Sequence, residues 1–271
     1  MKAATTRHRL RTAGVAIALL LAVAAGVLGM WRPWTPLPST APVGAPVDGA
    51  AAAPEAIAPA PLALPDHPTV LVFGDSWTYG SAATTPTLGY AYVLAELLDG
   101  ETIVNGVRGS GYLKPGIDGP TFGERVAALD PALTPDLIII QGSINDRAQG
   151  AAGYREAVTA AWDALAAKYP DATIVVLGPA PHELPVGTET ARIDTDLAEL
   201  AGARGWWYIS PIAQDWITEQ NYLDVIDVDL GRKHPSTEGH RYLAEKLATA
   251  LDELRAAPVT EAGGSETTPD E

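Results

Sequence analysis

Four short segments of this 271-residue chain carry the residue types from which a nucleophilic active site is built. They are Gly74-Asp75-Ser76-Trp77, Asn105–Gly111, Gly142–Asp146 and His234–His240. A serine hydroxyl becomes a good nucleophile when a neighbouring imidazole takes its proton. Backbone and side-chain N–H groups can then stabilise the negative charge on a carbonyl oxygen under attack. Ser76 and His234 are therefore the candidate nucleophile and base, provided that the fold brings them together.

The chain around these segments alternates short apolar runs with amphipathic runs rich in Ala and Leu. The apolar runs predict strands at Thr69–Phe73, Thr102–Asn105, Leu137–Gln141, Thr173–Leu177 and Trp206–Ile209. The amphipathic runs predict helices at Gly89–Leu98, Phe122–Leu129, Tyr154–Tyr169, Glu189–Ala203 and Glu238–Leu254. Strands that are apolar on both faces are typical of a parallel sheet covered by helices on each side. The sequence therefore predicts an α/β fold with a central parallel sheet.

Three of the four polar segments come directly after predicted strands. Ligands of such sheets bind at the carboxyl ends of the strands, so we expect these segments to share one edge. In the fourth segment, Pro235 keeps the residue before it out of helical geometry, which places His234 ahead of the last helix. A serine, backbone donors, an amide and a histidine can then converge.

These motifs and their order along the chain resemble those of a known superfamily. Gly74-Asp75-Ser76, Gly109, Gly142-x-x-Asn145 and His234-Pro235 occur in the order of the four motifs of SGNH (GDSL-type) hydrolases, across Thr69–Arg255. The resemblance implies a three-layer α/β/α, flavodoxin-like fold and a serine esterase or lipase. It also implies that Ser76 is the nucleophile and His234 the general base. The Ser76 N–H, the Gly109 N–H and the Asn145 side chain would form the oxyanion hole.

One position departs from the family pattern. The aspartate that orients the histidine usually stands three residues before it, and that residue here is Gly231. Asp229 is our candidate for the third member of the triad, with Asp227 as the next choice. A backbone carbonyl could orient the ring instead, which would leave a Ser–His dyad.

The individual residues of these motifs also have ordinary structural roles. A serine can cap a helix and a glycine can serve a turn, so only their joint occurrence after successive strands favours catalysis. Asp75 and Asp146 are expected to order their own turns, and His240 to lie on the last helix without a chemical role. Trp77, beside the candidate nucleophile, could line an acyl or sugar pocket.

Composition excludes several other classes of function. The chain has 33 acidic and 18 basic residues, a net charge of −15, which argues against nucleic acid as a partner. It has no cysteine, and therefore no disulfide, thiolate nucleophile or zinc–thiolate site. Neither a phosphate-binding P-loop nor a histidine–carboxylate set with metal-ligand spacing occurs, so we expect no cofactor and no metal.

The N-terminal region predicts contact with a membrane. Residues 1–12 are basic, and residues 13–31 contain no charge over nearly the length needed to cross a bilayer. This pattern predicts a single-pass signal-anchor with a cytoplasmic N-terminus and an extracellular domain. The alternative is a signal peptide whose cleavage releases a secreted protein. Beyond residue 32 the chain has 13 basic and 33 acidic residues, so the outer portion is strongly acidic.

The remaining chain divides into a linker, one domain and a tail. Residues 32–68 contain ten prolines and ten alanines and predict an extended linker. Residues 69–255 have the size of one domain, and residues 256–271 predict a disordered acidic tail.

We therefore expect an extracytoplasmic serine ester hydrolase that acts through an acyl-serine intermediate. The chain has only two Phe and two Met and no long amphipathic lid segment, which favours short acyl esters of carbohydrates or of small lipid-like molecules. An O-acyltransferase on cell-surface glycans, using the same serine and histidine, is one alternative. A catalytically silent glycan-binding module is the other.

Overall fold

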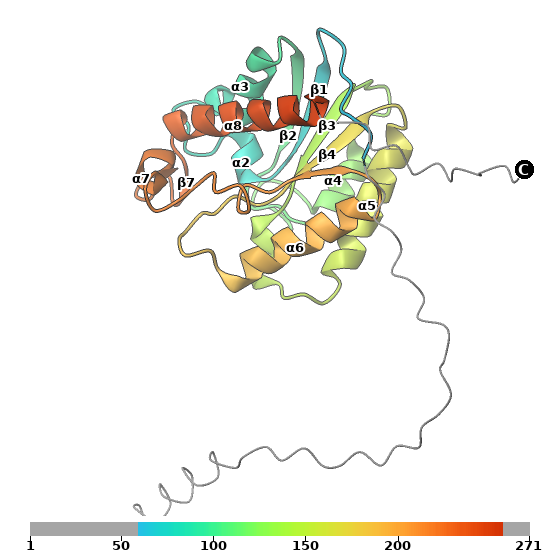
Figure 1. Cartoon of the computed structure of the whole chain (residues 1–271). Coiled ribbons are helices and arrows are strands. Elements are labelled where there is room, and N and C mark those ends of the chain that lie inside the picture. The colour runs from blue at the N-terminus through green and yellow to red at the C-terminus, as the bar shows by residue number, and fades with distance from the viewer. Residues whose placement is uncertain (1–58, 257–271) are drawn as a thin grey trace, which may run out of the picture. The chain divides into compact units, whose positions relative to one another are not determined.

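A computed structural model describes residues 59–256 of the chain. Five strands pair in parallel in the order β2-β1-β3-β4-β5, as Figure 1 shows. The strands are β1 Thr69–Gly74, β2 Glu101–Gly106, β3 Leu137–Gln141, β4 Thr173–Leu177 and β5 Trp207–Ile209. This order is that of the flavodoxin-like folds, and it confirms the predicted fold class.

The five longer helices also lie where the sequence predicts them, with ends that differ by at most two residues. They are α3 Tyr90–Leu97, α4 Phe122–Ala128, α5 Tyr154–Lys168, α6 Thr188–Gly202 and α8 Thr237–Ala256. Figure 1 shows α3 and α8 on one side of the sheet, and α5 and α6 on the other.

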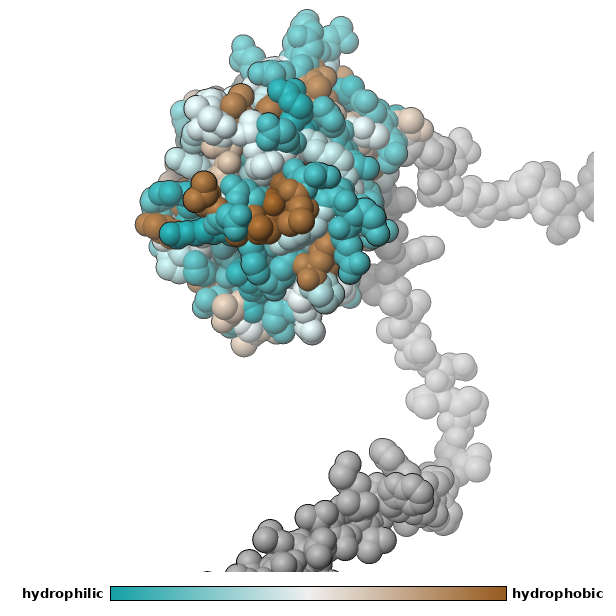
Figure 2. Space-filling view, turned by 90° about the vertical axis from the view of Figure 1, so that its left-hand side faces the viewer, coloured by the Kyte–Doolittle hydropathy of each residue, from teal (hydrophilic) through white to brown (hydrophobic). Residues whose placement is uncertain are grey.

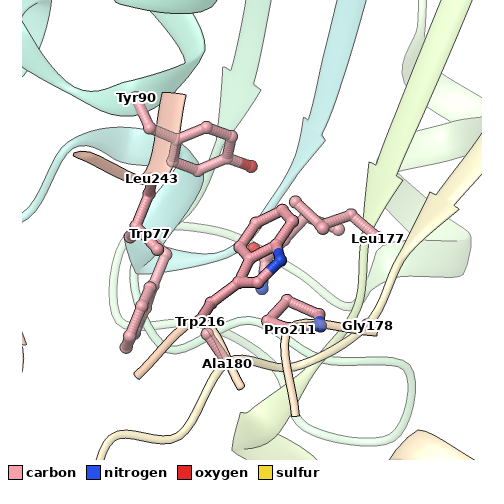
Figure 3. Close-up of a pocket in the computed structure, with 9 residues that line it drawn as sticks. Trp77, Tyr90, Leu177, Gly178, Ala180, Pro211, Trp216 and Leu243 are labelled. Atoms are coloured by element: carbon pink, nitrogen blue, oxygen red, sulfur yellow. The ribbon is translucent and has the colours of Figure 1, made fainter. Parts of the chain in front are cut away.

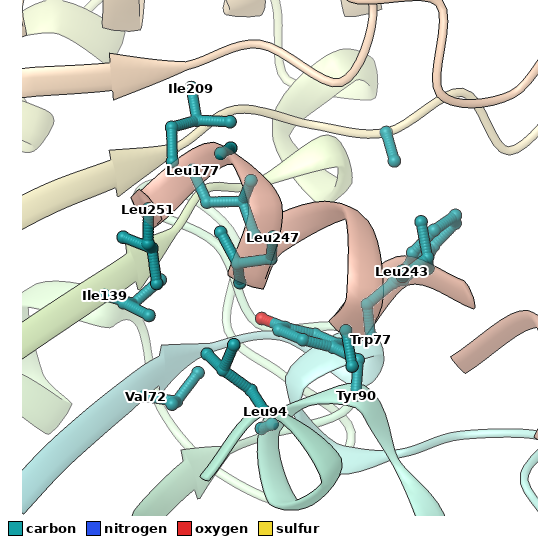
Figure 4. Close-up of a cluster of buried hydrophobic side chains, with 14 of the residues drawn as sticks. Val72, Trp77, Tyr90, Leu94, Ile139, Leu177, Ile209, Leu243, Leu247 and Leu251 are labelled. Atoms are coloured by element: carbon teal, nitrogen blue, oxygen red, sulfur yellow. The ribbon is translucent and has the colours of Figure 1, made fainter. Parts of the chain in front are cut away.

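The alternation of side chains along each strand supplies both apolar layers. In β1, Val70 and Val72 pack towards α3 and α8, whereas Leu71 and Phe73 pack towards α4 and α5. Figure 4 shows the first of these layers, in which Val72 of the sheet faces Leu94 and Leu247 of the helices. A strand buried on both faces needs apolar residues at every position, which explains the continuous apolar run of Leu137–Ile140.

Several short elements were not predicted, because a few residues cannot display a helical or strand period. They are the helices α2 Ser76–Tyr79 and α7 Tyr222–Val225, the 3₁₀ helices η1 Pro86–Leu88 and η2 Ile144–Ala148, and the antiparallel strands β6 Ile226–Asp227 and β7 His234–Pro235. Three of these six elements contain residues of the four sequence motifs. They therefore decide the local geometry of the candidate site.

The packed chain begins ahead of the predicted domain boundary at Thr69. Leu62 is buried in the layer beneath α8, and its N–H donates to the carbonyl oxygen of Leu254 at 3.1 Å. Leu62 lies within the predicted linker of residues 32–68, so the described end of that linker, from residue 59, packs against the domain.

Across residues 59–256, no helix combines the length and apolar composition that a bilayer span requires. The predicted span at residues 13–31 and the tail beyond residue 256 lie outside the described part of the chain.

Candidate active site

Ser76 lies at the first position of α2, directly after the end of β1. Asp75 caps this short helix, because its Oδ1 accepts the N–H of Trp77 at 2.9 Å. A side chain in place of Gly74 would collide with Thr78 and Gln141, so only glycine allows so tight a turn from strand to helix. The turn holds the Ser76 hydroxyl at the carboxyl edge of the sheet.

His234 contacts Ser76, although the two residues are 158 positions apart in the sequence. The Nε2 atom of His234 lies 2.8 Å from Ser76 Oγ, and its Nδ1 atom lies 2.7 Å from the carbonyl oxygen of Gly231. A carbonyl oxygen can only accept a hydrogen bond, so Nδ1 carries the ring proton. The lone pair of Nε2 then faces the serine hydroxyl, which is the arrangement that a general base needs.

A tight turn between β6 and β7 aims the Gly231 carbonyl at the ring. Its ends are joined where the Lys233 N–H donates to the Asp227 carbonyl oxygen at 2.8 Å. Arg232 and Lys233 both adopt left-handed backbone conformations, with φ of 50° and 65°. Such conformations cost about 1–2 kcal/mol per non-glycine residue. The rest of the domain therefore holds this turn in a conformation that its own residues disfavour.

The structure does not bring Asp229 to the histidine. Asp229 is exposed, and its N–H donates to Asp227 Oδ1 at 3.0 Å within the turn. Among the described residues, neither the Asp229 nor the Asp227 carboxylate makes a hydrogen bond to His234. Gly231, which stands where the family aspartate is expected, supplies its backbone carbonyl instead.

The two other candidate oxyanion donors follow β2 and β3, the strands that pair with β1 on its two sides. Gly109 has a φ of 73°, a left-handed conformation that favours glycine. The peptide that carries its N–H is held from the opposite side, because the Arg108 carbonyl oxygen accepts the Ile117 N–H at 2.7 Å. Asn145 lies in η2, and its Nδ2 donates to the Ser110 carbonyl oxygen at 3.0 Å and to Asp75 Oδ2 at 3.1 Å. The segments that carry Ser76, Gly109 and Asn145 are thus joined by one hydrogen-bond network.

Asp75 is the buried anion of that network. Its side chain is fully buried, and burial raises its pKa to about 6 although the Trp77 N–H stabilises the ionised form. The sequence suggested only that Asp75 orders its own turn. The structure shows that it also holds the Asn145 amide, through a contact between residues 70 positions apart.

Asp146 also accepts hydrogen bonds from a distant segment, the loop that follows Gly109. It is fully buried, and its carboxylate accepts hydrogen bonds from the Ser143 hydroxyl and from three successive backbone N–H groups of another loop. These groups belong to Tyr112, Leu113 and Lys114, at 2.7, 3.1 and 3.0 Å. Asp146 therefore ties the Asn145 segment to the Gly109 segment, beyond the local role that the sequence suggested.

His240 is a structural histidine. Its Nδ1 accepts the Tyr90 N–H at 3.2 Å, and its Nε2 lies 3.0 Å from the Ser81 carbonyl oxygen. Burial lowers its pKa to about 4, so the ring is neutral at physiological pH. It joins α8 to α3 and to the loop after α2, as a packed helix residue.

The surface beside His234 mixes apolar and charged groups. Leu223 of α7 and Leu230 of the β6–β7 turn are both strongly exposed, and Lys233 forms an ion pair with Glu183 at 2.6 Å. Figure 2 shows this face of the molecule, on which hydrophobic patches lie among hydrophilic ones.

Within residues 59–256, no group of three or more His, Asp or Glu side chains is placed to hold a metal ion.

Known proteins share both the sequence motifs and the fold. Residues 72–242, which include all four motifs, match the GDSL-like lipase/acylhydrolase family. A GDSL lipase of Mycobacterium tuberculosis is 29% identical over 147 residues, which cover 52% of this chain and 61% of that protein.

Two solved structures illustrate the shared fold. A carbohydrate acetylesterase family member from Sinorhizobium meliloti has a TM-score of 0.55 and 17% identity, and the match covers 70% of this chain and 100% of that one. A two-domain esterase active on acetylated mannans has a TM-score of 0.55 and 19% identity, with coverage of 75% and 53%. By its four motifs, its strand order and its match over residues 72–242, the chain belongs to the GDSL-like lipase/acylhydrolase family of the SGNH superfamily.

Proposed function

We propose that this protein is an extracytoplasmic serine ester hydrolase that acts on short acyl esters of carbohydrates through a Ser76–His234 dyad. The observation that carries the proposal is the 2.8 Å contact between Ser76 Oγ and His234 Nε2, with Nδ1 held by the Gly231 carbonyl. This geometry provides a nucleophile and a base of the correct tautomer without a third side chain.

The acylation step follows from these positions. His234 Nε2 takes the proton of Ser76 as Oγ attacks the ester carbonyl carbon, and a tetrahedral oxyanion forms. The N–H groups of Ser76 and Gly109 are proposed donors to that oxyanion. The Asn145 amide becomes a third donor when one of its two N–H groups exchanges its bond to the Ser110 carbonyl or to Asp75 for a bond to the oxyanion. When the intermediate collapses, the bond to the alcohol breaks and His234 returns the proton to the departing alkoxide.

Deacylation repeats these steps with water. His234 removes a proton from a water molecule, which attacks the acyl-serine, and the second tetrahedral intermediate releases a carboxylic acid and free Ser76. The imidazole becomes positively charged in both steps. A carbonyl oxygen stabilises that charge less than a carboxylate does, but it fixes the same tautomer and ring orientation.

The substrate class rests on similarity and on composition. The carbohydrate acetylesterase family member and the mannan-active esterase share this fold, which favours an acylated carbohydrate as substrate.

The uncharged segment at residues 13–31, preceded by four basic residues, supports a domain outside the cytoplasmic membrane.

The activity is tested on the full-length chain in detergent, with p-nitrophenyl acetate and an acetylated polysaccharide as substrates. We expect a burst of p-nitrophenol, release of acetate from the polysaccharide, and loss of both in Ser76→Ala. Transfer of the acetyl group to added oligosaccharide in preference to water would instead identify an acyltransferase. Absence of any Ser76-dependent turnover, with glycan binding retained, would identify a silent binding module.

Localisation is tested separately by fractionating cells that express the full-length chain. The proposal predicts recovery with the membranes and digestion of the domain by protease added outside the cell. Release of a shortened chain into the medium would identify a cleaved signal peptide, and a full-length chain in the cytoplasm would contradict the proposal.

A further inference from the structure

Arg125 of α4 is a buried cation among aromatic side chains. It is 5% exposed, and no other lysine or arginine of residues 59–256 is buried. Its guanidinium lies over the rings of Phe73 and Phe122, with Cζ 4.3 Å and 5.1 Å from the two ring centroids. A charged side chain is rarely buried without a compensating partner, so the position of Arg125 calls for a nearby anion.

Hydrogen bonds satisfy only part of this guanidinium. Arg125 Nη2 donates to the backbone carbonyl oxygen of Asn105 at 2.5 Å and to its side-chain Oδ1 at 2.6 Å. Asn105 lies near the end of β2, where it pairs in register with Phe73 of β1, two residues before Asp75. The other two nitrogens, Nε and Nη1, are buried and have no hydrogen-bond partner among the described residues. The charge of Arg125 is therefore compensated through space.

Asp75 is the anion that favours the charged form of Arg125. Burial lowers the pKa of Arg125 to about 10, although the charge of Asp75 acts in the opposite direction. Burial likewise raises the pKa of Asp75 to about 6, against the opposing effects of the Trp77 N–H and of the Arg125 guanidinium. The charge of Asp146, the other buried carboxylate among the described residues, raises the pKa of Asp75. Two buried carboxylates thus share one buried cation.

The other side of the α2 turn offers no second cation. A small cavity lies there, and Figure 3 shows the rings of Trp77, Tyr90 and Trp216 around it. Gln141 also lines the cavity, and its Oε1 accepts the Asp75 N–H at 3.3 Å. None of the lining side chains is charged at neutral pH, because burial raises the pKa of the Tyr90 phenol. Asp75 therefore depends on Arg125 for a compensating charge.

We propose that Arg125 is a positioning residue of the oxyanion hole, which keeps Asp75 ionised so that its carboxylate holds the Asn145 amide in place. The proposal rests on the ester hydrolysis proposed above and concerns how its oxyanion hole is maintained. Ionised Asp75 accepts the Trp77 N–H with Oδ1 and Asn145 Nδ2 with Oδ2. A proton on either oxygen weakens the bond that this oxygen accepts. While Asp75 holds one N–H of the amide, the other N–H is free to turn from the Ser110 carbonyl to the oxyanion.

Two substitutions of Arg125 separate its charge from its packing. Arg125→Lys keeps the positive charge, whereas Arg125→Gln removes it and keeps an N–H donor for Asn105. Both shorten the side chain and reduce its contact with the two phenylalanine rings, so their effects on folding should be similar in kind. Arg125→Met, which fills more of the same space without a charge, replaces Arg125→Gln if that variant does not fold.

Arg204 supplies a matched control in the same layer of side chains. Its guanidinium lies over the rings of Trp162 and Trp206, 5.5 Å and 5.6 Å from their centroids, and its Nη2 donates to Asp163 Oδ1 at 2.8 Å. Arg204→Gln therefore removes the same charge from a similar aromatic setting. Arg204 is not one of the charges that act on Asp75, so its loss should leave the pH dependence of the rate unchanged.

The experiment measures kcat for p-nitrophenyl acetate from about pH 5 to about pH 9, with the full-length chain in detergent and with the rate of Ser76→Ala subtracted. Loss of the Arg125 charge should move the acid side of the profile upwards by roughly one pH unit. Because the pKa of Asp75 is about 6 in wild type, Arg125→Gln should fall about fivefold below wild type near pH 6 and recover by about pH 8.5. Arg125→Lys and Arg204→Gln should follow the wild-type profile. A purely structural role for Arg125 would lower kcat by the same factor at every pH.

His234 must be neutral to act as a base, so its titration has to be separated from that of Asp75. In an Asp75→Asn background, Arg125→Gln should no longer move the acid side of the profile, because the group on which the charge acts is gone. The imidazole NMR signals of His234 should titrate at the same pH in wild type and Arg125→Gln. This second measurement stays available if Asp75→Asn does not fold.

The outcomes separate this proposal from the hydrolysis on which it rests. Ester turnover that depends on Ser76, with an equal loss at every pH in Arg125→Gln, overturns the role of Arg125 alone. An equal shift in Arg125→Lys, or a shift that persists in Asp75→Asn or appears in the His234 signals, also overturns it, because the charge would then not act through Asp75. Absence of turnover by wild type on every ester overturns the hydrolase proposal together with this one.

Discussion

The carbonyl oxygen of Gly231 lies 2.7 Å from His234 Nδ1, in the position that a carboxylate occupies in a Ser-His-Asp triad. No side-chain substitution removes a backbone carbonyl oxygen, and this oxygen does not take up a proton as a carboxylate can. We therefore expect substitutions near His234 to change the rate differently from substitutions in a triad.

Replacing the two acidic residues of the turn distinguishes the dyad from a triad. Asp229→Asn should retain kcat within about twofold of wild type, because the exposed side chain makes no hydrogen bond to His234 among the described residues. The equivalent change in a serine protease triad costs about 10⁴ in kcat. Asp227→Asn is the matched control, and its Oδ1 can still accept the Asp229 N–H. Steady-state rates on p-nitrophenyl acetate decide the matter, and a selective collapse in either variant would restore that carboxylate to the site.

Gly231 should be far more sensitive than either acid. A Cβ atom at this position would lie within 3 Å of the side chains of Asp227 and Ala82, so Gly231→Ala must displace the turn and its carbonyl. We expect kcat to fall about 10- to 100-fold with little change in KM, because misplacement by about 1 Å can cost about 10² in rate. Val228→Ala, in the same turn but with an exposed side chain, is the control. Equal rates in wild type and Gly231→Ala would show that the carbonyl does not position the base.

Asn145 is predicted to act in the transition state. Asn145→Ala removes one proposed oxyanion donor, which typically costs about 10²–10³ in kcat. Because the same amide also bonds to Asp75 and to the Ser110 carbonyl, thermal unfolding of the variant must be measured beside its rates. Arg147→Ala, two residues further along η2 and exposed, is the control for the local helix. A folded Asn145→Ala enzyme with wild-type kcat would exclude this donor.

His240 makes the stability of the domain depend on pH. Burial lowers its pKa from 6.5 to about 4 in the folded state, so the unfolded chain binds a proton first as the pH falls. The contribution of neutral His240 to the free energy of unfolding is fully present above pH 6.5. It is lost as the pH falls to about 4, and the change is up to about 3 kcal/mol. Urea unfolding of wild type and His240→Gln from pH 4 to pH 7.5 measures this contribution. The free-energy difference between the two proteins should grow with pH over that interval, and a constant difference would contradict the assignment.

The sheet and the order of the motifs along the chain could be predicted from the amino-acid sequence. A short continuous apolar run rich in β-branched residues, such as Leu137–Ile140, is typical of a strand buried on both faces, and the polar segments after β1, β2 and β3 follow from where those strands end. These are local properties of composition and period, so the five strands and five longer helices could be predicted within two residues of their observed ends.

The group that orients His234 could be identified only from contacts that form in the folded domain. The choice between Asp229, Asp227 and a backbone carbonyl depends on the β6–β7 turn, whose two-residue strands and left-handed Arg232 and Lys233 have no period or propensity that a sequence could display. Backbone carbonyls are present at every residue, so sequence cannot show which of them faces a ring. The same holds for the Asp75–Asn145 contact and for the cavity beside Trp77, which are formed by residues far apart in the chain and exist only once the sheet and both helical layers have packed.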